Sequence, residues 1–350
     1  MQKWKENIRN IEPYVPGEQP QNTNVIKLNT NESPYPPSPA VAMAINEYNS
    51  SNLRLYPSFV CKELKSALME TYPVSERELF LGNGSDEVLA LCFMTFFNSK
   101  KPVLFPDITY SFYDVWCNLY NIPYKRIPLD NNFRFVKEDY YGENGGIVIT
   151  NPNAPTSVYM ELEDIEDIIK HNDDVIVIVD EAYIDFGGRS AVDLIHKYDN
   201  LVVVQTYSKS RALAGIRVGY AMANSELINA LEAVKNSFNS YTINTLSQVI
   251  ATASARDKDY FNECVNKIIS AREWTVTELS KMGFETLPSK ANFIFTTNPN
   301  ISAEKLFNYL KSKNIFVRYF NKPRISEYLR ITIGTMEQME ALIDKIKEYK

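Results

Sequence analysis

Two patterns of hydrophobic and polar residues alternate through the middle of the chain. Unbroken apolar runs, rich in Val and Ile, predict strands that are buried on both faces, at residues 102–105, 146–150, 175–179, 201–204 and 218–222. Apolar residues at helical spacing predict helices at residues 40–49, 62–71, 85–96, 110–119, 162–169 and 191–198. Strands and helices that alternate in this way indicate an α/β fold with a mainly parallel sheet flanked by helices.

The two ends of the chain depart from this pattern. Residues 1–40 are rich in Pro, Asn and Gln, which predicts an extended arm. Helices dominate from residue 225 to 279, and the shorter strands and helices of the tail predict a smaller α+β domain. We therefore expect three parts: residues 1–45 as the arm and part of the small domain, residues 46–275 as the large domain, and residues 276–350 as the C-terminal small domain.

Polar segments directly follow several of the predicted strands, at residues 150–156, 180–183 and 206–209. Ligands of parallel sheets bind beyond the carboxyl ends of the strands, so we expect these segments to share one cavity. The glycine-rich turn at residues 82–87 opens a helix, and it would add free backbone N–H groups that can bind an anion.

Lys209 carries the most distinctive chemistry of these segments. A lysine that follows a buried strand can lose its solvation and become an amine nucleophile, although an exposed lysine on a surface loop is the commoner case. An amine beside an anion site suits an enzyme that uses pyridoxal phosphate, which would be held by the large domain. Asp180 would keep the ring nitrogen of this cofactor protonated, or else serve only as a helix cap. Tyr183 or Asn153 would donate a hydrogen bond to its phenolate oxygen.

The same cofactor needs a phosphate site and a partner for its ring. The candidate phosphate ligands lie around the glycine turn and the Lys209 loop: Gly84, Ser85, Asp86, Thr206, Ser208 and Arg217. The carboxylate of Asp86 would repel a phosphate, so only its N–H group is expected to bind. Tyr110 would stack on the ring unless it packs in the core. Arg330 would hold a substrate carboxylate bidentately unless it forms a surface ion pair.

Composition narrows the class of protein. The chain has 350 residues, 45% of them hydrophobic, and a net charge of −6, which argues against nucleic acid or an anionic membrane as the main partner. With two histidines and four widely separated cysteines, no metal site is expected, and reduced thiols in a cytoplasmic protein are the simpler account. No apolar leader or membrane span is visible.

A set of motifs along the whole chain resembles the fold-type I pyridoxal-phosphate aminotransferases. These motifs are Glu12-Pro-Tyr-Val-Pro-Gly17, Leu28-Asn-Thr-Asn-Glu32, Leu55-Tyr-Pro57, Gly82-Asn-Gly-Ser-Asp-Glu87, Asp180-Glu-Ala-Tyr183, Ser208-Lys-Ser-Arg-Ala-Leu-Ala-Gly-Ile-Arg-Val-Gly219 and Tyr328-Leu-Arg-Ile-Thr-Ile-Gly334. The first and the last favour the histidinol-phosphate aminotransferase family.

The resemblance implies roles for individual residues. Lys209 would be the Schiff-base lysine, Asp180 the partner of the pyridinium nitrogen and Tyr183 the donor to the phenolate oxygen. The protein would be a homodimer with a shared active site, in which Tyr56 reaches the phosphate of the neighbour's cofactor. Arg330 would bind the carboxylate of glutamate, the amino donor. The substrate pocket would be lined by Tyr14, Asn31 and Arg318.

One position departs from the family pattern, because the asparagine that usually contacts the phenolate oxygen is replaced by Ala154. That hydrogen bond would come from Asn153 or water, or it would be lost at a cost on the order of 1 kcal/mol. The expected reaction is amino transfer between glutamate and imidazole-acetol phosphate in histidine biosynthesis. Threonine-phosphate decarboxylase and aromatic aminotransferase remain alternatives on the same fold. A non-catalytic regulatory protein that binds pyridoxal phosphate is the alternative of another class.

Overall fold

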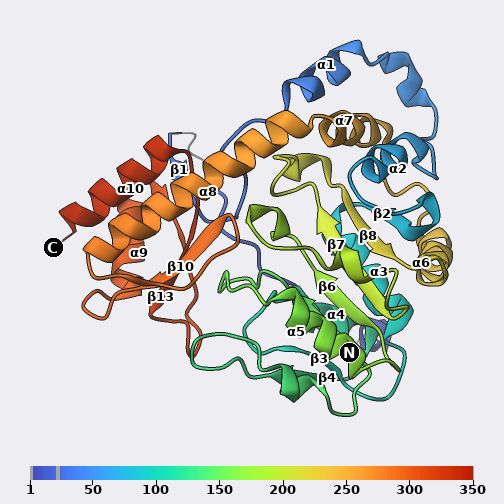
Figure 1. The fold of residues 1–350 in the computed structure, drawn as a ribbon, viewed down its shortest axis with the longest axis horizontal. Helices are drawn as coiled ribbons and strands as arrows, with labels where there is room; N and C mark the ends of the chain where they lie inside the picture. The colour runs from blue at the N-terminus through green and yellow to red at the C-terminus, as the bar shows by residue number, and fades with distance from the viewer. Residues whose placement is uncertain (1–2, 21–23, 350) are drawn as a thin grey trace.

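A seven-stranded sheet forms the centre of the larger part of the molecule (Figure 1). The structure is a computed structural model, and it describes residues 3–20 and 24–349. In spatial order the strands are β2 (Leu79–Gly82), β8 (Gly219–Ala223), β7 (Leu201–Thr206), β6 (Val177–Asp180), β5 (Gly146–Thr150), β3 (Val103–Pro106) and β4 (Tyr124–Ile127). Only β8 runs antiparallel to its neighbours β2 and β7. The predicted mainly parallel sheet is confirmed, whereas β2 and β4 were not predicted.

Both faces of this sheet are covered, which explains the unbroken apolar runs. Alternate residues of the central strands enter two different clusters: Val179 and Val203 lie in one, Ile178 and Val202 in the other. The first face packs against α2 (Lys62–Met69), α5 (Leu162–Lys170) and α7 (Thr245–Arg256). The second packs against α3 (Gly84–Phe96), α4 (Phe112–Tyr120) and α6 (Ser225–Phe238).

The helix predicted at residues 191–198 is wrong in type and length, because only a 3₁₀ turn, η6 (Ala191–Leu194), forms there. Ser190 caps this turn by accepting from Val192 N, and the buried carboxylate of Glu181 accepts the N–H of Ala191. These contacts tie the segment to the end of β6 instead of allowing a longer helix. The other 3₁₀ turns are η1 (Lys3–Asn7), η2 (Ser50–Arg54), η3 (Glu76–Glu78), η4 (Lys137–Tyr140), η5 (Ile184–Phe186) and η7 (Ala214–Ile216).

The C-terminal part of the chain builds a second, antiparallel sheet. Its order is β12 (Arg318–Tyr319), β13 (Tyr328–Thr332), β10 (Phe293–Thr297) and β9 (Glu285–Thr286). The helices that pack on it are α8 (Lys258–Lys281), α9 (Ala303–Ser312) and α10 (Met336–Glu348). The early strand β1 (Ile26–Lys27) pairs in parallel with β11 (Ile315–Phe316), so this segment of the arm joins the second part of the molecule.

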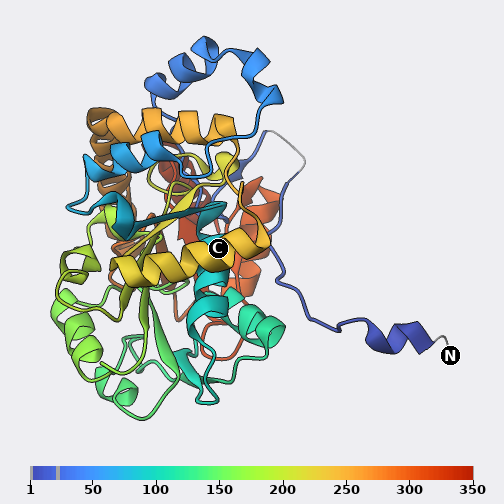
Figure 2. The same cartoon turned by 90° about the vertical axis from the view of Figure 1, so that its right-hand side faces the viewer.

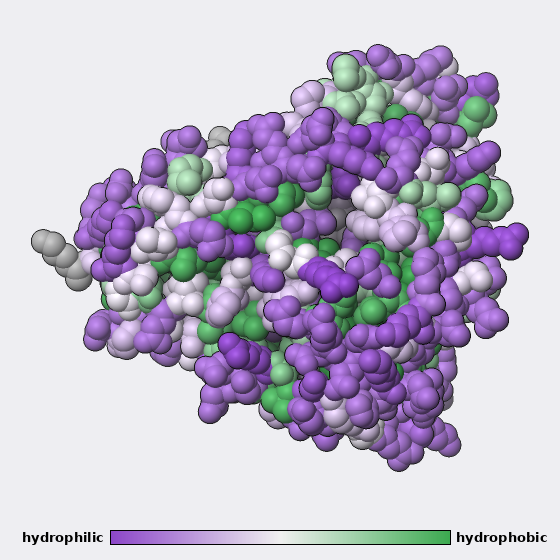
Figure 3. Space-filling model, viewed as in Figure 1, coloured by the Kyte–Doolittle hydropathy of each residue, from purple (hydrophilic) through white to green (hydrophobic). Residues whose placement is uncertain are grey.

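Helix α8 connects the two sheets, since it runs from beside α9 and α10 to α7 (Figure 1). The predicted border at residue 275 falls inside this helix, and the division into three parts stays a prediction. Figure 2 shows η1 extending away from the rest of the molecule, while α1 (Pro39–Glu47) and η2 stand out at the top. On the face drawn in Figure 3, hydrophobic side chains form patches within a mostly hydrophilic surface. None of the described helices has the length and apolar character needed to cross a membrane.

We expect Ile178→Ala to lower the free energy of unfolding by about 2–5 kcal/mol, because Ile178 is fully buried in the central strand and its truncation leaves a cavity. Urea unfolding would measure the change. Ile8→Ala is the matched control, since Ile8 is 61% exposed, and it should change stability by less than about 0.5 kcal/mol. Equal effects of the two variants would contradict this placement of β6.

Candidate active site

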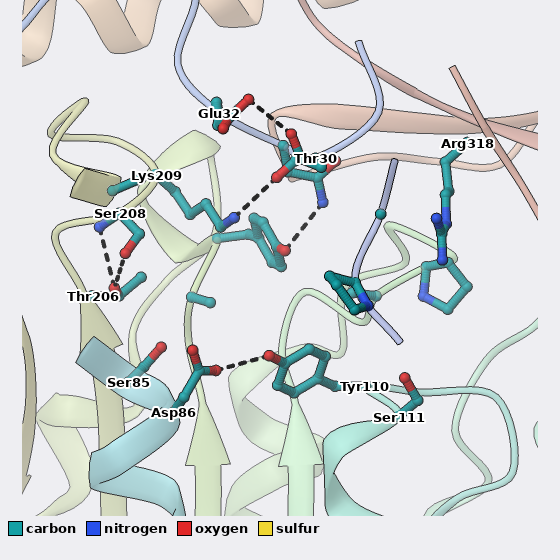
Figure 4. A pocket seen from close by; sticks show the side chains of 18 of the residues that line it. Thr30, Glu32, Ser85, Asp86, Tyr110, Ser111, Thr206, Ser208, Lys209 and Arg318 are labelled. Carbon is teal, nitrogen blue, oxygen red and sulfur yellow. Dashed lines mark hydrogen bonds between the residues drawn. The ribbon is translucent and has the colours of Figure 1, made fainter. Parts of the chain in front are cut away.

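A cavity of about 300 Å³ opens at the carboxyl ends of the central strands (Figure 4). The predicted site residues that line it are Tyr14, Asn31, Ser85, Asp86, Tyr110, Asp180, Tyr183, Thr206, Ser208, Lys209, Arg217, Arg318 and Arg330. The register of the sheet explains this convergence, since Asp180 pairs with Thr150 on one side and with Val204 on the other. The arm and the second sheet supply the opposite wall.

The amine of Lys209 points into this cavity (Figure 4). Its Nζ donates to the backbone oxygen of Thr30 at 3.3 Å and lies 5.7 Å from the centroid of the Tyr183 ring. No ion pair with a carboxylate is found for it among the described residues. The next residues anchor the loop: Ser210 Oγ donates to Asp185 at 2.5 Å, and Arg211 donates to Ser254 O at 2.7 Å. The lysine is therefore held on a fixed backbone with its amine available.

Asp180 ends β6 at the floor of the cavity and is 3% exposed. Burial raises the pKa of this carboxyl from 3.8 to about 6, although Tyr113 Oη and the N–H of Ala182 donate to it at 2.7 and 3.3 Å and so stabilise the charged form. The negative charge of Asp86 raises this pKa further. A cationic ring nitrogen beside Asp180 would reverse the shift, so the site fits a protonated pyridine.

Helix α3 points its N-terminus at the same cavity, where Ser85 and Asp86 line the wall. Two glycines make this approach possible. Gly84 has φ +83°, and a Cβ there would collide with the guanidinium of Arg217, while a Cβ on Gly219 would collide with the backbone N of Ser85. Gly84 itself does not line the cavity. Free N–H groups at a helix start favour an anion, so this wall fits a phosphate.

Hydroxyl and guanidinium groups complete the anion site. Thr206 Oγ1 donates to Ser208 Oγ at 3.0 Å, and Arg217 Nη1 lies 3.4 Å from the same oxygen. The expectation for Asp86 was incomplete: its carboxylate accepts from Arg217 Nη2 at 2.9 Å and from Tyr110 Oη at 2.8 Å. The ion pair with Arg217 limits the repulsion that this carboxylate exerts on a phosphate. It also fixes Tyr110, whose pKa is raised well above its usual value by burial and by Asp86.

The second sheet contributes arginines to the opposite wall. Arg330 is not a surface residue: burial lowers its pKa, its Nη2 donates to Asn29 O at 2.8 Å, and its Nε has no partner among the described residues. It forms no ion pair with a described carboxylate. A buried guanidinium with unused donors is suited to a substrate carboxylate. Arg318 lies nearby, and Tyr14 stacks on Phe112 with ring centroids 4.2 Å apart.

Besides Gly84, two predicted residues are not brought into the cavity. The amide of Asn153 is used by the protein, since it donates to Ile108 O and Thr156 Oγ1 and accepts from Thr109 Oγ1, each at 2.9 Å. Tyr56 is 82% exposed and stacks on Tyr241 at 4.7 Å. Ala154, in contrast, lines the cavity with its methyl group.

Sequence reasoning missed other functional neighbours. Thr30 contacts Lys209 through its backbone oxygen, and no pattern of side chains in the sequence predicts such a contact. Tyr113 holds Asp180, but its helical spacing resembles that of an ordinary core aromatic residue. Glu32 lines the cavity, and the ammonium group of Lys27 and the hydroxyl of Thr30 hold its pKa below the usual value despite partial burial. Among the described residues, no group of three or more His, Cys, Asp or Glu side chains could hold a metal ion.

Comparison with known proteins agrees with this geometry. Residues 23–346 match the family "Aminotransferase class I and II". This chain belongs to that family. It is 53% identical to the histidinol-phosphate aminotransferase of Clostridium botulinum (strain Okra) over 345 residues, 99% of this chain and 98% of that protein. The enzyme is a pyridoxal-phosphate-dependent aminotransferase.

Solved structures share the fold of this aminotransferase. Histidinol-phosphate aminotransferase from Sinorhizobium meliloti in complex with pyridoxal-5′-phosphate superposes with a TM-score of 0.83 at 22% identity, covering 93% of this chain and 92% of that one. L-threonine-O-3-phosphate decarboxylase from Porphyromonas gingivalis superposes with a TM-score of 0.81 at 19% identity, covering 93% and 99%. The fold therefore does not distinguish between these two reactions.

In the cofactor-free protein, Asp180→Asn should become increasingly stabilising, relative to the wild type, as the pH rises. Folding favours the protonated carboxyl, because its pKa is raised from 3.8 to about 6, so the wild type alone loses stability between these values. The difference in unfolding free energy should grow by roughly 3 kcal/mol between pH 4 and pH 7. Urea unfolding at each pH checks this. Asp173→Asn is the control, because Asp173 is exposed and hydrated, and a similar slope for it would contradict the assignment.

Proposed function

We propose that the protein transfers an amino group from glutamate to imidazole-acetol phosphate, which yields histidinol phosphate and 2-oxoglutarate. The observation that carries this proposal is a single cavity that joins the Lys209 amine, the Asp180 carboxylate, the start of α3 and the half-buried Arg330. The identity of 53% to a histidinol-phosphate aminotransferase, over nearly the full length of both chains, supports this substrate. The free, buried cysteines fit a cytoplasmic location for the reaction.

The residues that line the cavity indicate where the cofactor would bind. Bound pyridoxal phosphate supplies an electron sink that stabilises negative charge at the substrate's α-carbon. Asp180 would hold the ring nitrogen, and the start of α3 with Ser208 and Arg217 would hold the phosphate. Tyr110 would face the ring, because its hydroxyl is fixed by Asp86. Tyr183 would donate to the phenolate oxygen.

Lys209 would act on both substrates. When its Nζ is not bonded to the cofactor, Lys209 would take the proton from the substrate's α-carbon as a general base and would deliver it, as a general acid, to C4′ of the cofactor. Its amine already lies over Tyr183 and beside Thr30 O, so it stays within the cavity when free. One amine that serves two successive substrates requires the first product to leave before the second substrate binds.

Arg330 and Arg318 would select substrates that carry an anionic group. Arg330 is half-buried with an unused Nε donor and would receive the carboxylate of glutamate, while Arg318 lines the same cavity. The same arginines would then meet the phosphate of the second substrate. Threonine phosphate also offers a phosphate, so decarboxylation of it is the competing reaction on this fold.

We further propose that the active site is completed by a second copy of the chain. Residues 39–60 stand out from the molecule (Figures 1 and 2) and expose a series of large apolar side chains: Met43, Ile45, Leu53, Leu55, Tyr56, Phe59 and Val60. An exposed apolar surface of this kind favours a protein interface. Tyr56 does not line the cavity of its own chain, and in a homodimer its hydroxyl would reach the cofactor phosphate of the partner.

We expect Lys209→Ala to abolish the visible absorbance that depends on the lysine and to slow amino transfer by on the order of 10²–10⁴-fold or more, because the base and the covalent anchor are both lost. Absorbance and half-reactions with histidinol phosphate, threonine phosphate and phenylalanine would measure this. Lys125→Ala, at an exposed position of β4, is the control. Release of carbon dioxide from threonine phosphate would favour the decarboxylase, and cofactor binding without any amino transfer would favour the regulatory protein.

Mixing two inactive variants tests the shared site. In a heterodimer of a Lys209→Ala chain and a Tyr56→Ala chain, both defects fall in the same shared site, so the other site of each mixed pair is intact. Refolding an equal mixture should therefore restore about a quarter of the wild-type activity. Assays of each variant alone give the baseline. A mixture that is no more active than the two variants separately would show that Tyr56 serves its own chain or has no role in the site.

A further inference from the structure

The hydroxyl of Tyr183 is held in one orientation. The ring packs edge-on against Phe293, with centroids 4.9 Å apart and planes at 83°, and lies under the amine of Lys209. The hydrogen bond found for its hydroxyl within the described residues comes from Asn31, whose Nδ2 lies 3.1 Å away. The direction of the tyrosine proton therefore depends on Asn31.

Asn31 is itself clamped by the second sheet. Its backbone N–H donates to Thr332 Oγ1 at 3.0 Å, so the threonine's own proton goes to Asn31 Oδ1, which is 2.9 Å away. Its backbone oxygen accepts from Asn292 Nδ2 at 3.0 Å. The residue is 1% exposed and has φ +56°, a left-handed conformation that asparagine tolerates better than most residues.

This network decides which end of the Asn31 amide faces the tyrosine. Because Oδ1 is occupied by the threonine proton, the NH₂ group must point to Tyr183, whose oxygen accepts. A hydroxyl that accepts one hydrogen bond keeps its proton for another acceptor and donates it more strongly. The proton of Tyr183 is thus directed to the cavity.

The direction of the Tyr183 proton is important because residue 154 is an alanine. Ala154 lies in the same apolar cluster as Tyr183 and lines the cavity, and its methyl group cannot donate a hydrogen bond. On this side of the cavity the tyrosine hydroxyl is the group placed to donate to an oxygen anion of the cofactor. Loss of its orientation would not be compensated by residue 154.

We propose that Asn31, clamped by Thr332, is a positioning residue that keeps the Tyr183 hydroxyl turned toward the cofactor as a hydrogen-bond donor. This role differs from the substrate contact that the family resemblance implies for Asn31. The inference rests on the proposed role of Tyr183 at the phenolate oxygen. It assigns Asn31 an effect on the cofactor through Tyr183, whereas a purely structural Asn31 would affect only folding or cofactor occupancy.

The test is the pH midpoint of the visible absorbance of the protein loaded with pyridoxal phosphate. A donor to the phenolate oxygen weakens that oxygen's hold on the proton of the Lys209 imine, so loss of the donor should raise the midpoint. Asn31→Gly removes the amide and tolerates the left-handed backbone. Thr332→Val keeps the amide but releases its clamp. Each should raise the midpoint by roughly 0.5 to 1 pH unit, the equivalent of one ordinary hydrogen bond.

A double-variant cycle separates action through Tyr183 from other effects. Tyr183→Phe should raise the midpoint at least as far, and adding Asn31→Gly to it should cause no further change. Asn29→Ala is the matched control, because this nearby buried amide donates to Glu18 O and not to Tyr183, and it should leave the midpoint unchanged.

Distinct results would overturn distinct claims. If Tyr183→Phe moves the midpoint but Asn31→Gly and Thr332→Val do not, the inference is wrong while the role of Tyr183 stands. If Tyr183→Phe leaves the midpoint unchanged, the role of Tyr183 fails and the inference fails with it. A shift of equal size in Asn29→Ala, or a full further shift when Asn31→Gly is added to Tyr183→Phe, would also refute the inference.

Discussion

The active site depends on a carboxylate that is buried before any ligand arrives. Asp180 sits at the end of β6 with 3% exposure, and burial disfavours its charge. Hydrogen bonds from Tyr113 and from the N–H of Ala182 offset part of this cost. Within the described chain no lysine or arginine forms an ion pair with it. A pyridine nitrogen beside such a carboxylate is readily protonated. The attraction between the two opposite charges offsets the cost of removing each of them from water. In the proposed function, Asp180 at the floor of the cavity would therefore set the electronic state of the cofactor.

Residues 29–31 connect the two halves of the site. Arg330 donates to Asn29 O, Lys209 donates to Thr30 O, and Thr332 and Tyr183 both bond to Asn31. The lysine and Tyr183 lie in loops that follow strands of the large sheet, whereas the arginine and the threonine lie in β13 of the small one. Residues 29–31 would therefore help to set the distance between the group that contacts a substrate's amine, Lys209, and the group that contacts its carboxylate, Arg330. Any shift of the second sheet would move the substrate-binding and the tyrosine-orienting groups together.

Charge is distributed so that each anion has its own place. The Asp86 carboxylate bridges Arg217 and Tyr110 on the cofactor side, and the guanidinium retains a contact with Ser208. Arg330 and Arg318 face the substrate side without a described carboxylate partner. A phosphate bound near α3 would contact the N–H groups of the helix start. It would also contact Arg217, whose charge is partly neutralised by Asp86. In the proposed function, an anionic substrate would bind the guanidinium groups of Arg330 and Arg318, so that one cavity could hold two anions at once.

The sequence by itself determined the layered α/β fold and the segments that meet at the strand ends. Strands buried on both faces must be apolar throughout, so the runs at residues 146–150, 175–179 and 201–204 were recognisable, and Asp180 and Lys209 follow from where such runs end. Only the tertiary structure decided which way nearby polar side chains turn. Asn153 faces Ile108 and Thr156, not the cavity, and Tyr113 supports Asp180 from a helix. The Asn31–Thr332 contact joins residues 301 positions apart, and the antiparallel course of β8 follows from a loop that returns to the sheet. Periodicity reports which residues are buried, but the direction of a hydrogen bond depends on partners that only folding brings together.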